Sequence, residues 1–192
     1  MANVENVVLN DNGYFRFILN DVDLLPNPRN GEKKNRNFSG ELRTITNRDG
    51  TQFKTEERFA NFVVPRDMED AFMQNDIEMW QASEPDEDGH TTCFSKMKIK
   101  FGQYTKTKVY LVEPNQKPVN LTEETVGVVD NIRVRKVDVE LGRGSNPNKR
   151  GKYALWVRTL YIYQDLPQDP FASKFDAFYG SDEPQMDPFD RL

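Results

Sequence analysis

Residues 92–101 constrain the fold more than any other part of the chain, because two sets of side chains alternate through them. Successive side chains of a β-strand leave opposite faces. One face carries the residues expected in a core: Cys93, Ser95, Met97, Ile99 and Phe101. The other carries an aromatic ring and three lysines: Phe94, Lys96, Lys98 and Lys100. This pattern predicts a half-buried strand of an antiparallel sheet.

The lysine face has two interpretations. A row of like charges attracts an anionic partner, and the ring of Phe94 can stack on a nucleic-acid base. Exposed lysines also protect a solvated strand against edge-to-edge aggregation. The rest of the sequence has to decide between a binding face and a solvated one.

Charge is divided unevenly along the 192 residues, whose formal net charge is −5. From Gln164 onward the chain carries seven acidic and two basic residues, which leaves 24 of each in the preceding part. A neutral body with an acidic end is typical of a binding domain with an interaction tail. We therefore expect a domain at residues 1–163 and a disordered, aromatic-containing acidic tail at residues 164–192.

Several classes of function lack their sequence signatures. A single cysteine, Cys93, excludes an internal disulfide, and a single histidine, His90, cannot form a zinc site or a catalytic histidine pair. Gly-rich phosphate motifs, nucleophile elbows and spaced carboxylate pairs are absent from the sequence, so we expect no enzyme activity and no cofactor. No apolar run reaches the roughly 18 residues of a membrane span and no signal peptide is recognisable, so a cytoplasmic protein is expected.

Six further segments have the alternation of strands: residues 14–19, 38–46, 52–64, 107–113, 130–141 and 153–163. Asp49 and Gly50 form a hairpin turn signal between the second and third of these. Pro65 begins a helix whose apolar stripe contains Met68 and Phe72, with Met73, Ile77 and Trp80 as candidates for its continuation.

The apolar phase of residues 130–141 changes near Arg135, which predicts a bulge that bends the strand around a barrel. Together these patterns predict a mainly β protein, an OB-fold-like antiparallel barrel with one helix. Such a barrel presents a basic face and long loops to single-stranded nucleic acid. The candidate DNA-binding residues are the bases and aromatic residues of that face and of two loops: Lys33, Lys34, Arg36, Phe94, Lys96, Lys98, Lys100, Tyr104, Tyr110, Arg133, Arg135, Arg143, Lys149, Arg150, Lys152, Trp156 and Arg158.

Two loops contribute the bases outside the strands. Residues 20–37 end in a basic cluster, which a solvated loop would also explain. Residues 142–152 contain three glycines and four bases but no acid, and mobile, purely basic backbone suits an irregular phosphate chain. Trp156 has two open alternatives, since a strand tryptophan can be packed or can stack on a base.

The order of these features resembles the bacteriophage single-stranded-DNA-binding proteins of the T7-like type. The resemblance covers residues 38–192 and rests on the runs VVP at 63–65, KMKIKF at 96–101, KVYLVE at 108–113 and NIRVRKVDVELG at 131–142. It implies an OB-fold core that binds single-stranded DNA in DNA replication and DNA recombination. It also implies an acidic C-terminal tail that contacts replication or recombination proteins and other copies of the protein. Homodimers and a location in the host cell cytoplasm are further expectations from the resemblance.

The chain departs from the family at the tail's end, where Asp190, Arg191 and Leu192 follow the last aromatic residue. We also expect the tail to compete with DNA for the basic face, because a tether raises its local concentration to about the millimolar range. The alternative function is a structural or assembly protein of a virion, whose basic face contacts an acidic protein surface.

Overall fold

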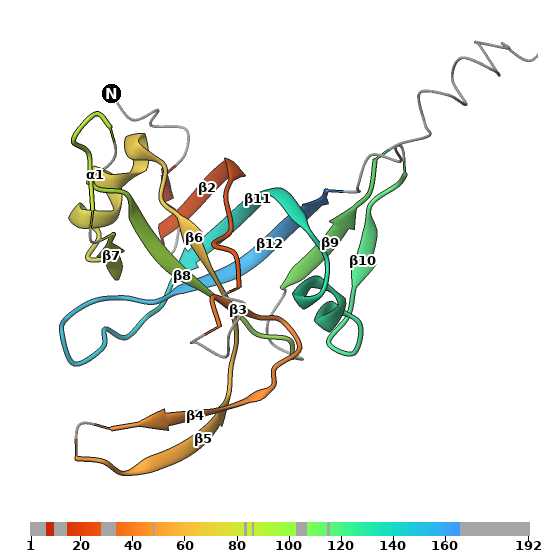
Figure 1. Ribbon diagram of the computed structural model, residues 1–192. Coiled ribbons are helices and arrows are strands. Elements are labelled where there is room, and N and C mark those ends of the chain that lie inside the picture. Colours follow the sequence, from red (N-terminus) through yellow and green to blue (C-terminus); the bar gives the residue numbers. More distant parts are fainter. Residues whose placement is uncertain are drawn as a thin grey trace, which may run out of the picture.

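The computed structural model describes residues 7–9, 15–27, 34–47, 49–82, 84–85, 87–102, 107–114 and 116–165. Within them the chain is mainly β, as expected, with one α-helix (Figure 1). The expected acidic tail lies outside the described residues, apart from its first two positions. Where the structure is described, no helix has both the length and the apolar character that crossing a membrane requires.

The elements follow one another along the chain with these bounds: β1 Val7–Leu9, β2 Phe15–Val22, β3 Arg36–Asn37, β4 Leu42–Thr46, β5 Gln52–Glu56, β6 Arg58–Val63, α1 Arg66–Gln74, β7 Met79–Gln81, β8 Cys93–Ile99, β9 Lys108–Val112, β10 Val119–Leu121, the 3₁₀ helix η2 Val126–Asp130, β11 Val134–Arg143 and β12 Leu155–Gln164.

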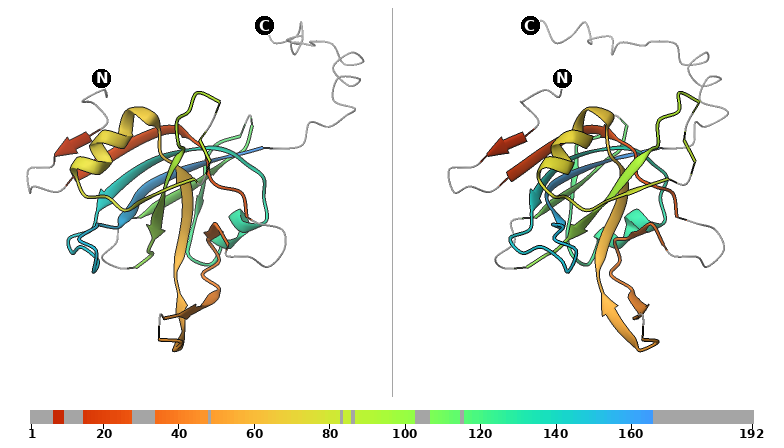
Figure 2. Two further views of the ribbon diagram at one scale, coloured as in Figure 1. Left: turned by 60° about the vertical axis from the view of Figure 1, so that its left-hand side comes forward. Right: turned by 90° about the vertical axis from the view of Figure 1, so that its left-hand side faces the viewer.

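The main sheet has the order β1, β2, β11, β12, β8, β6, β3, with β7 beside β8 and the pair β9–β10 beside β12 (Figures 1 and 2). Strand β12 runs parallel to two neighbours, because its first residues pair with β8 and residues 159–163 pair with β9. The sheet is therefore mixed and open, which differs from the expected closed antiparallel barrel. The two parallel partners of β12 make the sheet mixed, and local alternation could not have revealed them.

The segment after β2 lies against β6. Leu24 and Phe62 form an isolated antiparallel bridge. On either side of it, the Leu25 N–H donates to the carbonyl of Asn61 and the Val63 N–H donates to the carbonyl of Asp23, both at 2.9 Å. These bonds bring the far end of β2 to the strand at the other side of the sheet.

The predicted alternation of β8 is confirmed. Cys93, Ser95, Met97 and Ile99 are buried, and the residues between them are half-buried. The core on the inner face includes a group of rings in which the Phe17 and Phe72 centroids lie 5.0 Å apart in an edge-to-face contact. Burying such rings is the main favourable term in the folding of this sheet.

The helix prediction is confirmed at Met68 and Phe72, which are buried beneath α1. Met73, which the expected stripe included, is 55% exposed. The helix ends at Gln74, so Ile77 and Trp80 reach the body from the following turn and from β7.

The pairing of β11 with β12 contains two backbone irregularities, of which the sequence predicts the first. The register shifts between Val134 and Lys136, as the change of apolar phase predicts. A second shift between Glu140 and Leu141 leaves Arg158 of β12 without a register partner. Ordinary alternation exposes Trp156 and Arg158 and buries Leu155 and Val157, and the bulge then shifts the phase so that Leu160 is buried as well.

The predicted hairpin at residues 47–50 is confirmed. The Asn47 N–H donates to the carbonyl of Thr51 at 2.8 Å, and Gly50 has the positive φ of 83° that the turn needs. Within the described residues, β4 and β5 pair only with each other. Their hairpin projects from the body in every view (Figures 1 and 2). The expected single strand 52–64 is divided at Glu57, the one residue between β5 and β6.

Candidate nucleic-acid interface

Two strands place a row of basic and aromatic side chains on the outer face of the sheet. We call Lys96, Lys98, Trp156 and Arg158 the basic-aromatic strip. Parallel pairing sets Trp156 of β12 directly beside Lys98 of β8, and the ammonium of Lys98 lies 5.7 Å from the centroid of the tryptophan ring. The Trp156 side chain is 37% exposed, so one part of it remains open to a ligand.

Two glycines of β11 and the following loop leave space for this strip. A Cβ atom at Gly142 would lie 2.8 Å from Nε of Arg158, and one at Gly144 would lie 3.2 Å from Nε1 of Trp156. Arg158 therefore lies close against the backbone of β11, and Trp156 lies close against the backbone of the loop that follows it. The predicted loop 142–152 includes both glycines, but Gly142 belongs to a paired strand, whereas Gly144 lies in the connection between β11 and β12.

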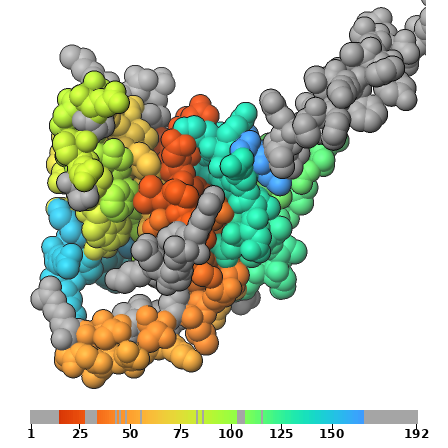
Figure 3. Space-filling view, in the orientation of Figure 1, coloured from red at the N-terminus to blue at the C-terminus, as the bar shows by residue number. Residues whose placement is uncertain are grey.

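A groove of about 480 Å³ runs beside the strip at the base of the β4–β5 hairpin. In the space-filling view the hairpin, in orange at the bottom, stands away from the body and leaves a hollow above itself (Figure 3). The groove is lined by three basic, three acidic and three apolar residues: Arg58, Lys98, Lys100, Glu56, Glu57, Glu123, Ile99, Phe101 and Trp156.

Two of the three bases of the groove, Arg58 and Lys98, are paired with its acids. Glu57 accepts from Lys98 at 2.7 Å and lies 3.6 Å from the ammonium of Lys96. Arg58 binds both Glu56 at 3.1 Å and Glu123 at 2.9 Å. The sequence offers a binding face or a solvated face for these lysines; in the structure Lys96 and Lys98 are ion-paired and only 27% and 32% exposed, so they are not a freely solvated row.

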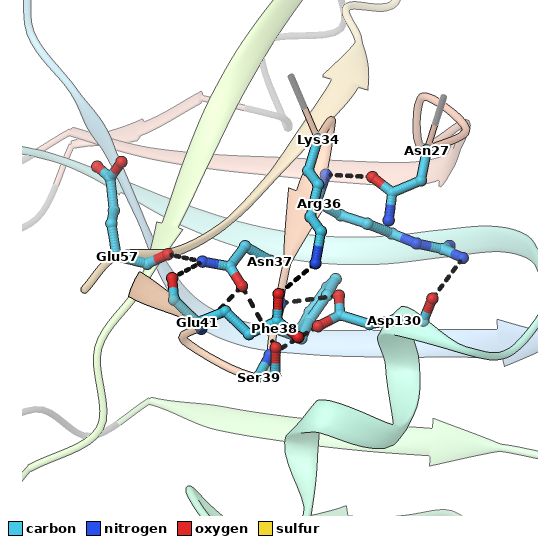
Figure 4. Close-up of polar contacts among 9 residues, drawn as sticks. All are labelled: Asn27, Lys34, Arg36, Asn37, Phe38, Ser39, Glu41, Glu57 and Asp130. Carbon is cyan, nitrogen blue, oxygen red and sulfur yellow. Dashed lines mark hydrogen bonds and ion pairs between the residues drawn. The ribbon is translucent and has the colours of Figure 1, made fainter. Parts of the chain in front are cut away.

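A polar cluster holds the neck of the hairpin (Figure 4). The side chain of Asn37 is fully buried; its Nδ2 donates to the carbonyls of Glu41 at 2.9 Å and Glu57 at 2.8 Å, and its Oδ1 accepts from the Glu41 N–H at 3.0 Å. The Asp130 carboxylate accepts from the N–H groups of Phe38 and Ser39 at 2.9 and 2.8 Å. These bonds fix Glu57 at the edge of the groove.

Two predicted site arginines serve the fold. Arg36 donates to the carbonyl of Ile132 at 2.9 Å, and burial lowers the pKa of its guanidinium while nearby Asp130 opposes that change. The guanidinium of Arg143 lies 4.6 Å from the Phe15 ring and 4.4 Å from the Tyr153 ring. Neither arginine lines the groove.

Two predicted stacking residues are packed on other rings. Phe94 stacks on Trp80, with centroids 6.4 Å apart and ring planes at 25°. Tyr110 stacks on Tyr161, with centroids 4.8 Å apart and planes at 14°. Both are half-buried, and Tyr104 lies outside the described residues.

The remaining predicted bases are distributed around the body. Nε of Arg133 lies 3.7 Å from Oδ2 of Asp165, and Cζ of Arg135 lies 6.0 Å from the ring centroid of Tyr163. Lys34 pairs with Glu41 at the hairpin neck, and Lys33 lies outside the described residues.

The loop between β11 and β12 carries the last three predicted bases. Lys149 and Arg150 are exposed, and Lys152 pairs with Asp76 at 2.9 Å. Arg150 and Lys152 line a second, smaller hollow beside Met73 and Trp80. These loop bases do not line the groove beside the strip.

The groove also contains residues that sequence reasoning missed. Arg58 and Glu57 line it, although the predicted strand 52–64 gave neither a role in a site. The ring of Phe59 is fully buried and does not line the groove, but it lies under Lys96, whose ammonium is 4.5 Å from the ring centroid, and this contact was not expected. The alternation of Ala60 and Phe62 toward the core could have placed Phe59 outward. No local signal identifies Glu57, because its role depends on the register between β6 and β8.

Chemically, the arrangement can hold a phosphate on ammonium groups and a flat ring on Trp156. Within the described ranges, no group of three histidine, cysteine, aspartate or glutamate residues is placed to hold a metal ion. Comparison with known proteins identifies no relative: no family model, no curated protein and no solved structure matches the chain.

Proposed function

We propose that the protein binds single-stranded DNA without base specificity, along the groove beside the basic-aromatic strip. The observation that carries this proposal is Trp156, an exposed ring close to glycine backbone with Lys98 on one side and Arg158 next to it on β12. Single-strand binders combine a stacking platform with bases that follow the phosphates. Every base has a flat face, so such a platform tolerates any sequence.

An OB-type barrel is the fold that we propose for this binding. The order β2, β11, β12, β8, β6 and the Leu24–Phe62 bridge back toward β2 support a partly open ring of five strands. OB folds bind through the face of their second and third strands and the loops after the first and fourth. Here these would be β6 and β8, the segment with the β4–β5 hairpin, and the loop between β11 and β12. The groove lies on that face.

The biological setting follows from the resemblance to the T7-like phage proteins. The protein would protect and present single strands during DNA replication or recombination in the host cytoplasm. The acidic tail would contact replication or recombination proteins once DNA has released it. A virion assembly protein that binds an acidic protein surface is the alternative, and it requires no exposed ring.

A titration of a labelled oligothymidylate by fluorescence anisotropy tests the function. Trp156→Ala should weaken binding by about 1–3 kcal/mol, roughly 5- to 150-fold, because one stacked base is lost. Trp156→Phe keeps a ring and serves as the matched control, with an affinity near that of the unchanged protein. Affinity should fall with salt, at a log-log slope of about 0.7 per phosphate contacted.

Two results would overturn the proposal. A hairpin duplex that binds as well as the single strand is incompatible with stacking on splayed bases. An alanine variant with unchanged affinity and melting temperature would remove Trp156 from the site and favour the protein-surface alternative.

A further inference from the structure

The Glu57 carboxylate pairs with both lysines of the basic-aromatic strip. Its Oε1 lies 2.7 Å from the Lys98 ammonium and its Oε2 lies 3.6 Å from the Lys96 ammonium, so one carboxylate reaches both lysines of the strip. A phosphate group presents the same chemistry, two anionic oxygens that accept from ammonium donors. Glu57 and a phosphate therefore require the same partners.

The two lysines are held where they are by aromatic rings. The Lys96 ammonium lies 4.5 Å from the ring centroid of Phe59, and the Lys98 ammonium lies 5.7 Å from that of Trp156. Each contact adds attraction between the charge and the ring face. Swinging away to reach a distant phosphate would sacrifice these contacts, so the incoming anion has to bind where Glu57 is.

The backbone around Glu57 places its carboxylate beside Lys96 and Lys98. Glu57 is the single residue between β5 and β6, and its carbonyl accepts from Nδ2 of the fully buried Asn37 at 2.8 Å. Its side chain is 21% exposed, whereas Glu56 and Glu123 are 55% and 50% exposed and pair with Arg58. Of these three groove acids, Glu57 is the most buried and is the partner of the strip lysines.

We propose that Glu57 is a built-in competitor of DNA, a carboxylate that holds the phosphate site in the free protein and that a phosphate displaces on binding. This inference rests on the proposed function. The exchange of one anion for another keeps Lys96 and Lys98 paired throughout. It lowers the affinity for each phosphate and makes release of the strand easier, which suits a protein that must give up its DNA to other proteins.

The test is Glu57→Gln, which removes the charge and keeps the shape and the backbone carbonyl. Binding of a labelled oligothymidylate at low salt should become about fivefold tighter, because the Glu57 carboxylate no longer competes with phosphate for Lys96 and Lys98. The factor corresponds to the free energy of a partly exposed ion pair. Glu123→Gln is the matched control, with the same change of charge in the same groove, and its gain should stay under about twofold. Melting temperatures measured alongside show that each variant is folded.

A double-mutant cycle separates occupation of the lysines from general repulsion. In a background of Lys96→Gln and Lys98→Gln, Glu57→Gln should give no more gain than the control Glu123→Gln, because the carboxylate no longer has ammonium groups to occupy. Glu57→Asp keeps the charge but is too short to reach both lysines, so it should also tighten binding. This second variant decides the matter if Glu57→Gln lowers the melting temperature.

The outcomes distinguish this inference from the function on which it rests. Equal gains for Glu57→Gln and Glu123→Gln, or a gain of about fivefold that persists without the two lysines, would overturn the competitor role and leave DNA binding intact. Absence of binding by both the unchanged protein and Glu57→Gln would overturn the function and the inference together.

Discussion

Asn37→Ala should destabilise the protein by about 3 kcal/mol. The side chain of Asn37 is fully buried and makes three hydrogen bonds of 2.8–3.0 Å to backbone groups of Glu41 and Glu57. Each such bond contributes about 1 kcal/mol net, and a group that stays buried without a partner costs more. Backbone pairing of β3 with β6 through Asn37 and Phe59 is unaffected by the change, so the loss reports the side chain alone.

Urea unfolding followed by tryptophan fluorescence measures this loss. Asn47→Ala is the matched control, because the Asn47 amide donates to the Thr51 hydroxyl at an exposed position of the hairpin tip. Its cost should stay within about 0.5 kcal/mol. If Asn37→Ala were as mild as this control, the polar cluster would not be what holds the neck.

Asn37→Asp adds a pH dependence that has a definite sign. An ionised carboxylate at this position would face two carbonyl oxygens and could not donate to them. The folded state would therefore raise the pKa of the new carboxyl above its unfolded value of about 3.9. Stability should be highest below that pH and fall as the pH rises, so the variant should be less stable at pH 7 than Asn37→Ala.

Three further predictions concern the strip, the opposite part of the sheet and the tail. Gly144→Ala should push Trp156 aside, because the new Cβ would lie 3.2 Å from its Nε1, and should weaken oligothymidylate binding about threefold or more with little change in melting temperature. Tyr163→Phe should cost about 1 kcal/mol near neutral pH, because it removes a hydroxyl that donates to Asp138 at 2.6 Å. That bond raises the pKa of Tyr163 to about 12. Its contribution to the free energy of unfolding is therefore present below pH 10 and lost as the pH rises from about 10 to 12. Urea unfolding of the unchanged protein and of Tyr163→Phe across this pH range measures that loss. A chain that ends at Asp165 should bind the oligonucleotide more tightly than the whole chain at low salt, and equal affinities across a salt series would exclude competition by the tail.

Local patterns predict much of this fold. The alternation around Met97 sets the two faces of β8 because a strand has a period of two, and the phase change near Arg135 requires a bulge for the same reason. The Asp49-Gly50 turn signal identifies its hairpin because few residues adopt positive φ. These features depend on neighbours in sequence, so no knowledge of the remaining chain is needed.

The candidate site is less predictable because it depends on pairing between distant strands. Lys98 and Trp156 become neighbours only through the parallel register of β8 and β12, which no local pattern specifies. The same limit explains Arg36 and Arg143, whose charge suggested phosphate binding but whose guanidinium groups contact carbonyls and rings of other elements. The charge of a basic residue can be read from the sequence, whereas its partner is known only once the fold is known.

The position of β12 has a consequence for the synthesis of the protein. It is the last strand of the described chain, and it pairs with β8, β9 and β11. A ribosome makes all three partners before it, so a nascent chain that stops before Leu155 exposes strand edges that have no partner yet. The body can therefore complete its sheet only after residue 164 has emerged. Shorter N-terminal fragments are expected to aggregate or to be degraded, and they would not serve as reduced versions of the protein.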